Sequence, residues 1–360
     1  LGGITVLGLG AITAAVAVGV METAAVRGIA LAVPGFVLIG LGIGAAGTNL
    51  LALLAVRVDT ARQAAAGSAV WIMMIFGLAA TGITAGQLLD PYSASRLLAV
   101  TAGVAALALL LAVLGTWGQG APVGAVADAA QPEGGAMSFR QAAQELWQDG
   151  RVRGFTLFVF ASMLAYNLQD LILEPFAGHV FGLSVGQSTA LGGMHHAGAL
   201  AGMLAVLASG TVLRRLVVVP VRVWIVGGCV LSGVALLALA YGGTHAPGWP
   251  LGPNIFALGL ANGAFAVAAI GAMMGLAREG QGRHEGIRMG VFGAAQAIAF
   301  GLGSFLGTAA VDLTRGLLPL PLAYGSVFAA EGLVFLLAGA LALRLGHYDT
   351  PAHAPALAGE

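Results

Sequence analysis

The sequence contains no lysine, a single cysteine and few charged residues of either sign. Only 8% of its 360 residues are charged, and its 15 basic residues, all arginine, balance 15 acidic ones. Soluble domains carry about 25% charged residues, so a water-soluble core does not account for this composition. Cys229 has no partner, which excludes a disulfide framework and a cysteine metal site. Because there is no basic block, we expect no nucleic-acid partner.

The motifs of several enzyme classes are missing as well. The chain has no phosphate-binding glycine loop, no nucleophile elbow and no HExxH motif. Nucleotide-driven transport and hydrolysis are therefore unsupported. We expect a protein that is not an enzyme, with no catalytic residues and no resident metal.

Apolar residues dominate what is present. Hydrophobic residues make up 59% of the chain and the mean hydropathy is +0.94, which predicts an all-α membrane protein. At about 20 apolar residues per crossing, we predict ten spans, near residues 1–21, 29–56, 64–86, 97–117, 154–174, 187–208, 219–241, 253–277, 289–312 and 322–343. Glycine pairs four residues apart favour close helix packing in lipid and occur at Gly40/Gly44, Gly198/Gly202, Gly259/Gly263, Gly271/Gly275 and Gly303/Gly307.

One long polar interval, residues 118–153, divides the chain. It separates four spans in residues 1–117 from six in residues 154–345, and a tail follows over 346–360. Within it we predict an amphipathic surface helix, capped by Ser138 and Gln141. If the interval is cytoplasmic, that side of the membrane collects twelve arginines, and the other side only Arg27, Arg96 and Arg315. The positive-inside rule then places the linker and the tail in the cytoplasm.

This layout is typical of the major facilitator superfamily, in which a long linker joins two six-helix halves. We therefore expect a helix bundle of this superfamily with ten spans of a probable twelve. Residues 1–117 would be the third to sixth helices, and the start at Leu1 would leave out the first two. A complete ten-helix protein is the alternative.

A cluster of amides and acids, Asn167, Gln169, Asp170 and Glu174, stands at the outer end of the fifth span. An ionisable side chain within a span costs roughly 2.5–3.5 kcal/mol, so each is a functional candidate. Asp170 and Glu174 are four residues apart, which predicts a shared helix face. They could bind a polar or cationic headgroup, act as a gate, carry protons or lock the helix to a neighbouring helix. The structural alternative is that both acids are solvated at the interface or cap the helix before Pro175.

Five further polar residues lie inside spans of the second half. A neutral imidazole at the depth of His195 or His196 can ligate the magnesium of a pigment, but the two side chains point about 100° apart and cannot serve one centre symmetrically. A hydrogen bond to a neighbouring helix is the alternative for each. Interhelical bonding is also the favoured role of Asn262 and Gln296, although Gln296 is kept as a ligand-binding or gating candidate. Glu331, midway along the last span, is the second carboxylate candidate.

The stretch NLQDLILEPFAGHVFGLSVGQST, residues 167–189, resembles the PucC and LhaA proteins, the bacteriochlorophyll delivery family of the major facilitator superfamily. The matching residues are Gln169, Asp170, Leu173, Glu174, Pro175, Gly178, Phe181, Gly182, Gly186 and Thr189. The resemblance extends over residues 153–166, 290–307 and 324–345. Two positions depart from the pattern: His179 stands where an acidic residue is usual, and His195 with His196 where apolar or aromatic residues are expected.

The resemblance implies a membrane assembly factor that binds or delivers bacteriochlorophyll to light-harvesting antenna polypeptides, in the inner, intracytoplasmic membrane of a phototrophic bacterium. Bacteriochlorophyll would be the cargo or bound pigment. Besides lipid, the implied partners are antenna polypeptides, the reaction-centre complex or bacteriochlorophyll synthesis enzymes. Asp170 and Glu174 would fix the outer end of the site, and His195 or His196 would ligate magnesium. Two alternatives stay open: a proton-coupled small-molecule transporter that uses Asp170, Glu174 or Glu331, and a pigment-free scaffold for antenna assembly.

Overall fold

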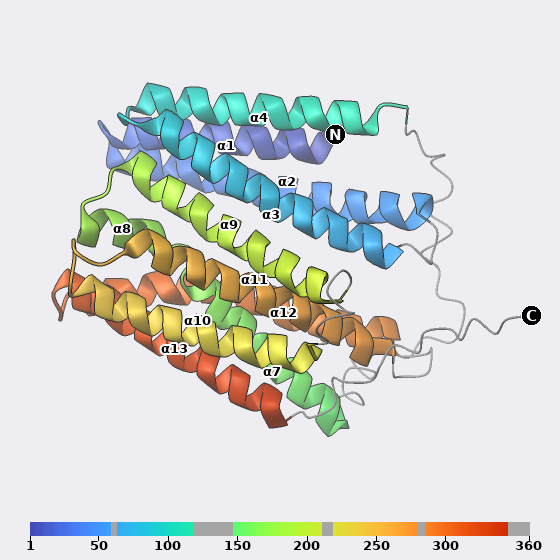
Figure 1. The fold of residues 1–360 in the computed structure, drawn as a ribbon. Coiled ribbons are helices and arrows are strands. Elements are labelled where there is room, and N and C mark those ends of the chain that lie inside the picture. Colours follow the sequence, from blue (N-terminus) through green and yellow to red (C-terminus); the bar gives the residue numbers. More distant parts are fainter. Residues whose placement is uncertain (59–62, 119–146, 211–218, 279–284, 345–360) are drawn as a thin grey trace, which may run out of the picture. The chain divides into compact units, whose positions relative to one another are not determined.

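A computed structural model describes residues 1–58, 63–118, 147–210, 219–278 and 285–344. Within these ranges the chain forms helices and turns and no strand (Figure 1). Ten helical segments of this part are long and apolar enough to cross a membrane, which confirms the ten predicted spans. The predicted surface helix with Ser138 and Gln141, and the tail from 346 to 360, lie outside the described residues.

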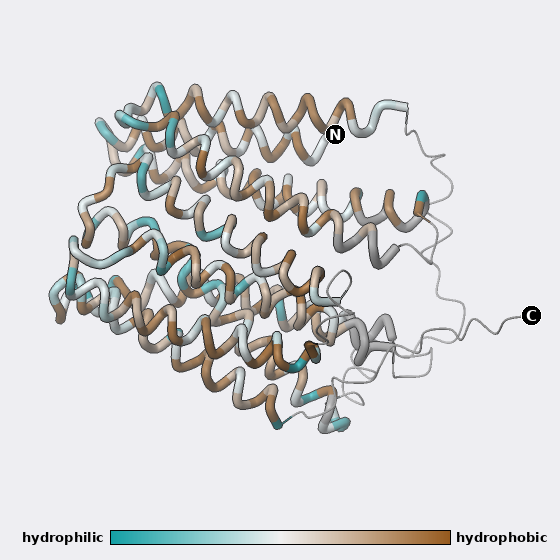
Figure 2. Tube along the Cα trace, viewed as in Figure 1, coloured by the Kyte–Doolittle hydropathy of each residue, from teal (hydrophilic) through white to brown (hydrophobic). Residues whose placement is uncertain are grey.

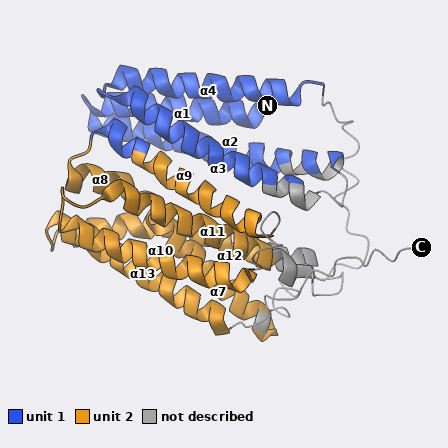
Figure 3. Ribbon diagram, in the orientation of Figure 1, with its two compact units in different colours: residues 1–136, 184–190 blue, residues 137–183, 191–360 orange. Residues whose placement is uncertain are grey.

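The chain divides into two compact units, residues 1–136 with 184–190, and residues 137–183 with 191–360 (Figure 3). The first unit contains the helices α1 (Gly2–Met21), α2 (Ala25–Arg57), α3 (Gln63–Leu89) and α4 (Ala94–Thr116). The second contains α7 (Gly150–Leu168), α8 (Leu173–Phe181), most of α9 (Val185–Gly210), α10 (Val221–Gly243), α11 (Leu251–Arg278), α12 (Glu285–Thr314) and α13 (Leu320–Arg344). The predicted domain limits at residues 117 and 153 stay predictions.

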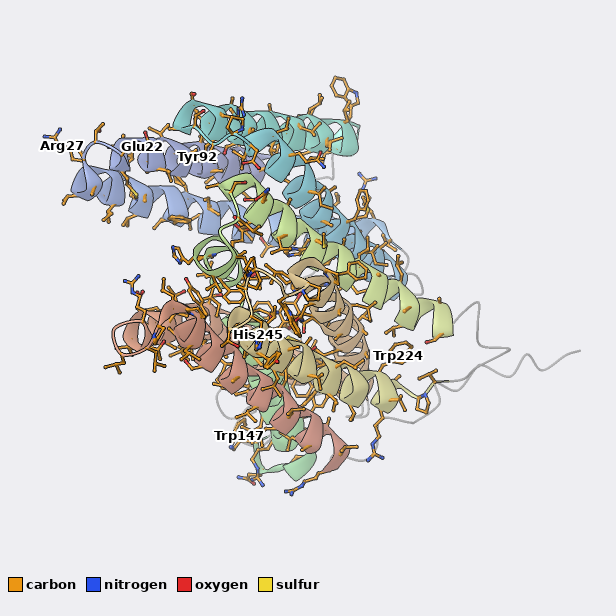
Figure 4. All side chains as sticks on the ribbon, turned by 60° about the vertical axis from the view of Figure 1, so that its left-hand side comes forward. Glu22, Arg27, Tyr92, Trp147, Trp224 and His245 are labelled. Carbon is orange, nitrogen blue, oxygen red and sulfur yellow. The ribbon has the colours of Figure 1, made fainter. Side chains whose placement is uncertain are left out.

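The spans are helical because a bilayer offers no partner to backbone N–H and C=O groups, so each segment must satisfy its own. Hydrophilic positions gather mainly at the helix ends (Figure 2). Glu22 and Arg27, for example, lie at the turn between α1 and α2 (Figure 4). Glu22 therefore marks the end of a span.

In the first unit, glycines bring α1 and α2 together. A Cβ atom on Gly10 would lie 2.7 Å from the carbonyl oxygen of Gly35, and one on Gly3 would lie 2.6 Å from the amide nitrogen of Ala46. The predicted pair Gly40/Gly44 is not part of this contact, because a Cβ on either would meet no atom of the described residues within 4 Å. Two glycines four residues apart lie on the same face of a helix, but their spacing does not show whether that face meets a neighbouring helix.

The core of the second unit is built from aromatic rings of several helices. Phe265 of α11 packs edge-on against Phe158 of α7 and Phe335 of α13, each at a centroid distance of 6.1 Å. Phe176 of α8 packs against Phe328 of α13 at 4.9 Å. These buried rings hold α7, α8, α11 and α13 in a fixed arrangement, on which the polar side chains described below depend.

Three of the predicted glycine pairs, one each in α9, α11 and α12, lie at helix contacts. Gly198 and Gly202 of α9 face the backbone of α11, Gly259 and Gly263 of α11 face that of α9, and Gly303 and Gly307 of α12 face the end of α7. On the same helix α11, a Cβ at Gly271 would meet nothing within 4 Å among the described residues. The contact between α9 and α11 is therefore one of backbone against backbone.

Helix α9 begins at a capping box that its sequence SVGQ encodes. The Ser184 hydroxyl accepts a hydrogen bond from the Gln187 N–H at 3.1 Å, and the Gln187 side-chain oxygen accepts one from the Ser184 N–H at 3.0 Å. The same hydroxyl donates to Asp90 Oδ2 at 2.7 Å, within the first unit. Ser184 thus satisfies a backbone donor of α9 and orients the carboxylate that follows α3.

Candidate functional site

The fifth predicted span is broken just before its acidic residues. Helix α7 ends at Leu168, residues 169–172 form a turn, and the nine-residue helix α8 begins at Leu173. Pro175 lies in the first turn of α8, where its missing N–H costs nothing, whereas inside one continuous helix it would remove a hydrogen bond. The prediction that Asp170 and Glu174 share one helix face is therefore wrong, because Asp170 lies in the turn and Glu174 on α8.

The four residues of the cluster divide into a buried pair and an exposed pair. Asn167 is buried, and its side-chain amide donates a hydrogen bond to the backbone carbonyl of Met163 at 3.1 Å. The backbone carbonyl of Asn167 accepts one from the Ser304 hydroxyl at 3.5 Å. Gln169 is 1% exposed, and neither atom of its amide has a hydrogen-bond partner among the described residues. The side chains of Asp170 and Glu174 lie on the exposed side.

The middle of α9 approaches this exposed pair. A Cβ atom on Gly192 would lie 2.9 Å from Glu174 Oε1, so the absence of a side chain there makes room for the carboxylate. His196, one turn later, has Nδ1 2.9 Å from the Gly192 carbonyl oxygen and interacts electrostatically with Asp170. The structure thus brings together three predicted residues, Asp170, Glu174 and His196, from three separate segments.

His195 faces the other way, into the helix bundle. Its Nε2 atom lies 3.3 Å from the Asn262 Nδ2 atom of α11, and Asn262 Oδ1 accepts a hydrogen bond from the Ser232 hydroxyl of α10 at 2.7 Å. All three residues are buried. His195 and Asn262 therefore form interhelical hydrogen bonds, the role that the sequence analysis kept for each of them.

Ser232 is the member of this network that sequence reasoning missed. A serine in an apolar helix commonly bonds the carbonyl three or four residues before it, as Ser162 does here with the carbonyl of Phe158 at 2.6 Å. A single serine therefore does not indicate a partner on another helix. The signal would have been Gly228, four residues earlier on the same helix face, where the backbone of α10 approaches α11.

The other two candidates lie away from the cluster. Glu331 is fully buried on the face of α13 that also carries Phe328 and Phe335, and neither of its carboxyl oxygens has a hydrogen-bond partner in the described part of the chain. Gln296 is half-buried on α12. Within the described ranges no hydrogen bond connects either residue to Asp170, Glu174 or His196.

His179 has a partner of its own. Its Nδ1 atom lies 2.9 Å from the hydroxyl oxygen of Tyr324, which joins the short helix α8 to the start of α13. Tyr324 in turn packs against Phe176 at a centroid distance of 5.6 Å. This position departs from the acidic residue expected there, and the histidine fixes α8 to the aromatic core.

Comparison with known proteins identifies the family. The model of the family described as "PUCC protein" matches residues 1–349. The chain belongs to the PucC family. It is 47% identical over 340 residues to the "Bacteriochlorophyll synthase 44.5 kDa chain" of Rhodobacter capsulatus, which covers 94% of this chain and 78% of that protein. It is 29% identical to the "Protein PucC" of the same species, over 88% of this chain and 68% of the relative.

Solved structures identify the fold. A mutant of the nucleoside transporter NupG superposes with a TM-score of 0.54 at 17% sequence identity, covering 96% of this chain and 84% of that one. A bacterial homologue of the human lysosomal transporter Spinster gives a TM-score of 0.50 at 16% identity, covering 96% and 81%. This PucC-family chain is therefore a multi-pass membrane protein with a fold of the major facilitator type, as predicted.

The described residues offer single imidazole donors rather than a cluster of metal ligands. No group of three or more His, Cys, Asp or Glu residues in the described ranges could hold a metal ion. If a magnesium-containing pigment is bound, a neutral imidazole would supply a nitrogen ligand to its metal. His196 carries such an imidazole at the edge of the cluster, half-buried within a spanning helix.

Proposed function

We propose that this PucC-family protein is a non-enzymatic assembly factor that binds bacteriochlorophyll and delivers it to light-harvesting antenna polypeptides in the inner, intracytoplasmic membrane of a phototrophic bacterium. The observation that carries the proposal is the gathering of His196, Asp170 and Glu174 at one place in apolar, membrane-spanning helices. Polar groups within spanning segments are costly, which makes them candidates for a functional role. The name of the relative at 47% identity supports a connection with bacteriochlorophyll.

Each part of the cluster has a place in this function. The imidazole of His196 would offer a ligand to magnesium, and the exposed carboxylates can accept hydrogen bonds from donor groups of a partner helix. The apolar helices around them provide the environment that a pigment with a long hydrocarbon tail requires. The partners that follow are antenna polypeptides, and beyond them the reaction-centre complex or the enzymes that supply bacteriochlorophyll.

The test is to purify the protein gently from a phototrophic host and to delete its gene in the same strain. We expect bacteriochlorophyll to copurify with the protein, and antenna complexes to fall in the deletion strain. Absence of pigment together with normal antenna assembly would refute the proposal. Antenna polypeptides that crosslink to a pigment-free protein would instead identify a scaffold.

Proton-coupled transport of a small molecule is the second candidate, and Glu331 is the observation that favours it. A carboxyl group that is fully buried, with no hydrogen-bond partner for either oxygen in the described ranges, is an expensive feature to keep within a span. The fold shared with transporters permits this function but does not by itself support it.

Flux measurements decide this second candidate. In proteoliposomes with an imposed pH gradient, Glu331→Gln should abolish substrate flux, whereas the control Glu22→Gln, an exposed carboxylate at the end of α1, should not change it. Equal flux in the wild type and Glu331→Gln would refute proton coupling through this residue.

A further inference from the structure

The hydrogen bonds around the two adjacent histidines distinguish their chemistry. In His195, Nε2 faces the Asn262 amide at 3.3 Å. Asn262 Oδ1 already accepts from the Ser232 hydroxyl, so the group that Asn262 presents to His195 is the amide NH2, which can only donate. The Nε2 lone pair of His195 is therefore occupied by this hydrogen bond inside the bundle.

In His196 the opposite nitrogen is occupied. Nδ1 lies 2.9 Å from the carbonyl oxygen of Gly192, which can only accept. The Nδ1 atom therefore carries the proton, and in the neutral ring the Nε2 atom carries the lone pair. Histidines that ligate metals through Nε2 are commonly fixed in this tautomer by a hydrogen bond from Nδ1 to a carbonyl group.

His196 is also the more accessible of the two histidines. His196 is half-buried, whereas His195 is only 7% exposed. The Glu174 carboxylate lies against Gly192, one turn before His196, and Asp170 is within electrostatic range of the ring.

We propose that His196, and not His195, is the axial ligand of the magnesium of a tetrapyrrole bound by this protein, and that His195 has a structural role in the network with Asn262 and Ser232. This assignment rests on the proposed function, since it concerns the same pigment. It goes further by naming the atom, Nε2 of His196, that forms the bond. Asp170 and Glu174 are positioned beside the pigment without ligating its metal.

The test compares matched variants of the full chain, loaded with bacteriochlorophyll in detergent or purified with it from the host. His196→Leu removes the proposed ligand, while His195→Gln keeps an acceptor for the Asn262 amide. The readouts are the ratio of pigment to protein and the visible absorption bands, whose positions report the number of axial ligands on magnesium. His196→Leu should lower pigment affinity by at least about tenfold, since even changes around a ligand cost that much at metal sites. His195→Gln, which lies outside the cluster, should keep the wild-type band positions.

Two further measurements separate a lost ligand from a lost fold. The unfolding temperature of each variant, recorded without pigment, shows whether the bundle is intact. His196→Gly supplemented with free imidazole should regain the band positions of the wild type, because the small molecule can occupy the vacated ligand position. Failure of imidazole to restore them in a well-folded variant would contradict the assignment.

The remaining outcomes separate a failure of the assignment from a failure of the proposed function. If the wild type binds pigment and His196→Leu binds it equally with unchanged bands, the assignment is wrong and the proposed function stands. If His196→Leu keeps the wild-type bands and one of the variants His195→Gln, Asp170→Asn or Glu174→Gln loses them, the residue replaced in that variant is the magnesium ligand. If the wild type binds no pigment under any of these conditions, the assignment and the proposed function fall together.

Discussion

Replacing Gly263 by alanine should destabilise the second unit by forcing α9 and α11 apart. The new Cβ atom would collide with the carbonyl oxygen of Ala199 and would lie 2.6 Å from both the carbonyl carbon and the Cα atom of that residue. These are backbone atoms of a helix, so no side-chain rotation can relieve the contact. The helices must separate by several tenths of an ångström, and the Asn262–His195 hydrogen bond, already 3.3 Å long, must lengthen.

The expected magnitude follows from three contributions. Overpacking a tight contact costs about 1–3 kcal/mol, and a clash with rigid backbone belongs at the upper end. Alanine gains about 1 kcal/mol over glycine inside a helix. A lost interhelical hydrogen bond in a membrane protein costs about 0.6 kcal/mol on average. We therefore expect Gly263→Ala to lower the free energy of unfolding by about 2–3 kcal/mol.

The same helix provides the control. A Cβ atom at Gly271 would meet nothing within 4 Å in the described part of the chain, so Gly271→Ala retains only the gain in helix propensity. Its free energy of unfolding should equal that of the wild type or exceed it by up to about 1 kcal/mol. The assay is thermal unfolding in detergent, supported by titration with a denaturing detergent. If Gly263→Ala proves as stable as Gly271→Ala, the close contact between α9 and α11 is refuted.

Three other predictions concern single side chains. Asn262→Leu should lower the free energy of unfolding by about 1 kcal/mol, because it leaves the Ser232 hydroxyl and His195 Nε2 without their partner; an unchanged unfolding curve would contradict the network. Ser184→Ala should cost about 1 kcal/mol through loss of the helix cap, and it should speed amide exchange in the first turn of α9; unchanged protection there would count against the cap. Glu331→Leu should leave the unfolding temperature unchanged or raise it, because the carboxyl forms no hydrogen bond within the described residues; a clear drop would mean that Glu331 has a structural partner.

The spans could be predicted from the sequence because bilayer thickness sets the length of a crossing. Few charged residues interrupt the apolar segments, so all ten appear in the structure. The break at residues 169–172 was not predicted, although Pro175 signals it. The proline was interpreted as the end of a span, whereas it lies in the first turn of the separate helix α8.

The site could be predicted only in part. Asp170, Glu174 and His196 were each candidates because polar residues are conspicuous in an apolar sequence. That they meet was not predictable, because the apolar residues of α9 form no stripe that indicates which face of the helix turns toward α8. The different roles of His195 and His196 follow from their hydrogen-bond partners, Asn262 and the backbone carbonyl of Gly192. A backbone carbonyl is present at every residue, so the sequence cannot indicate this partner.

The central claim, that this PucC-family protein handles bacteriochlorophyll, is tested most directly by one absorption spectrum of the protein purified gently from a phototrophic host. We expect bacteriochlorophyll bands that coelute with the wild-type protein and are lost or shifted in His196→Leu. A pigment-free spectrum from a well-folded wild-type protein, purified from cells that are actively making antenna complexes, would contradict it.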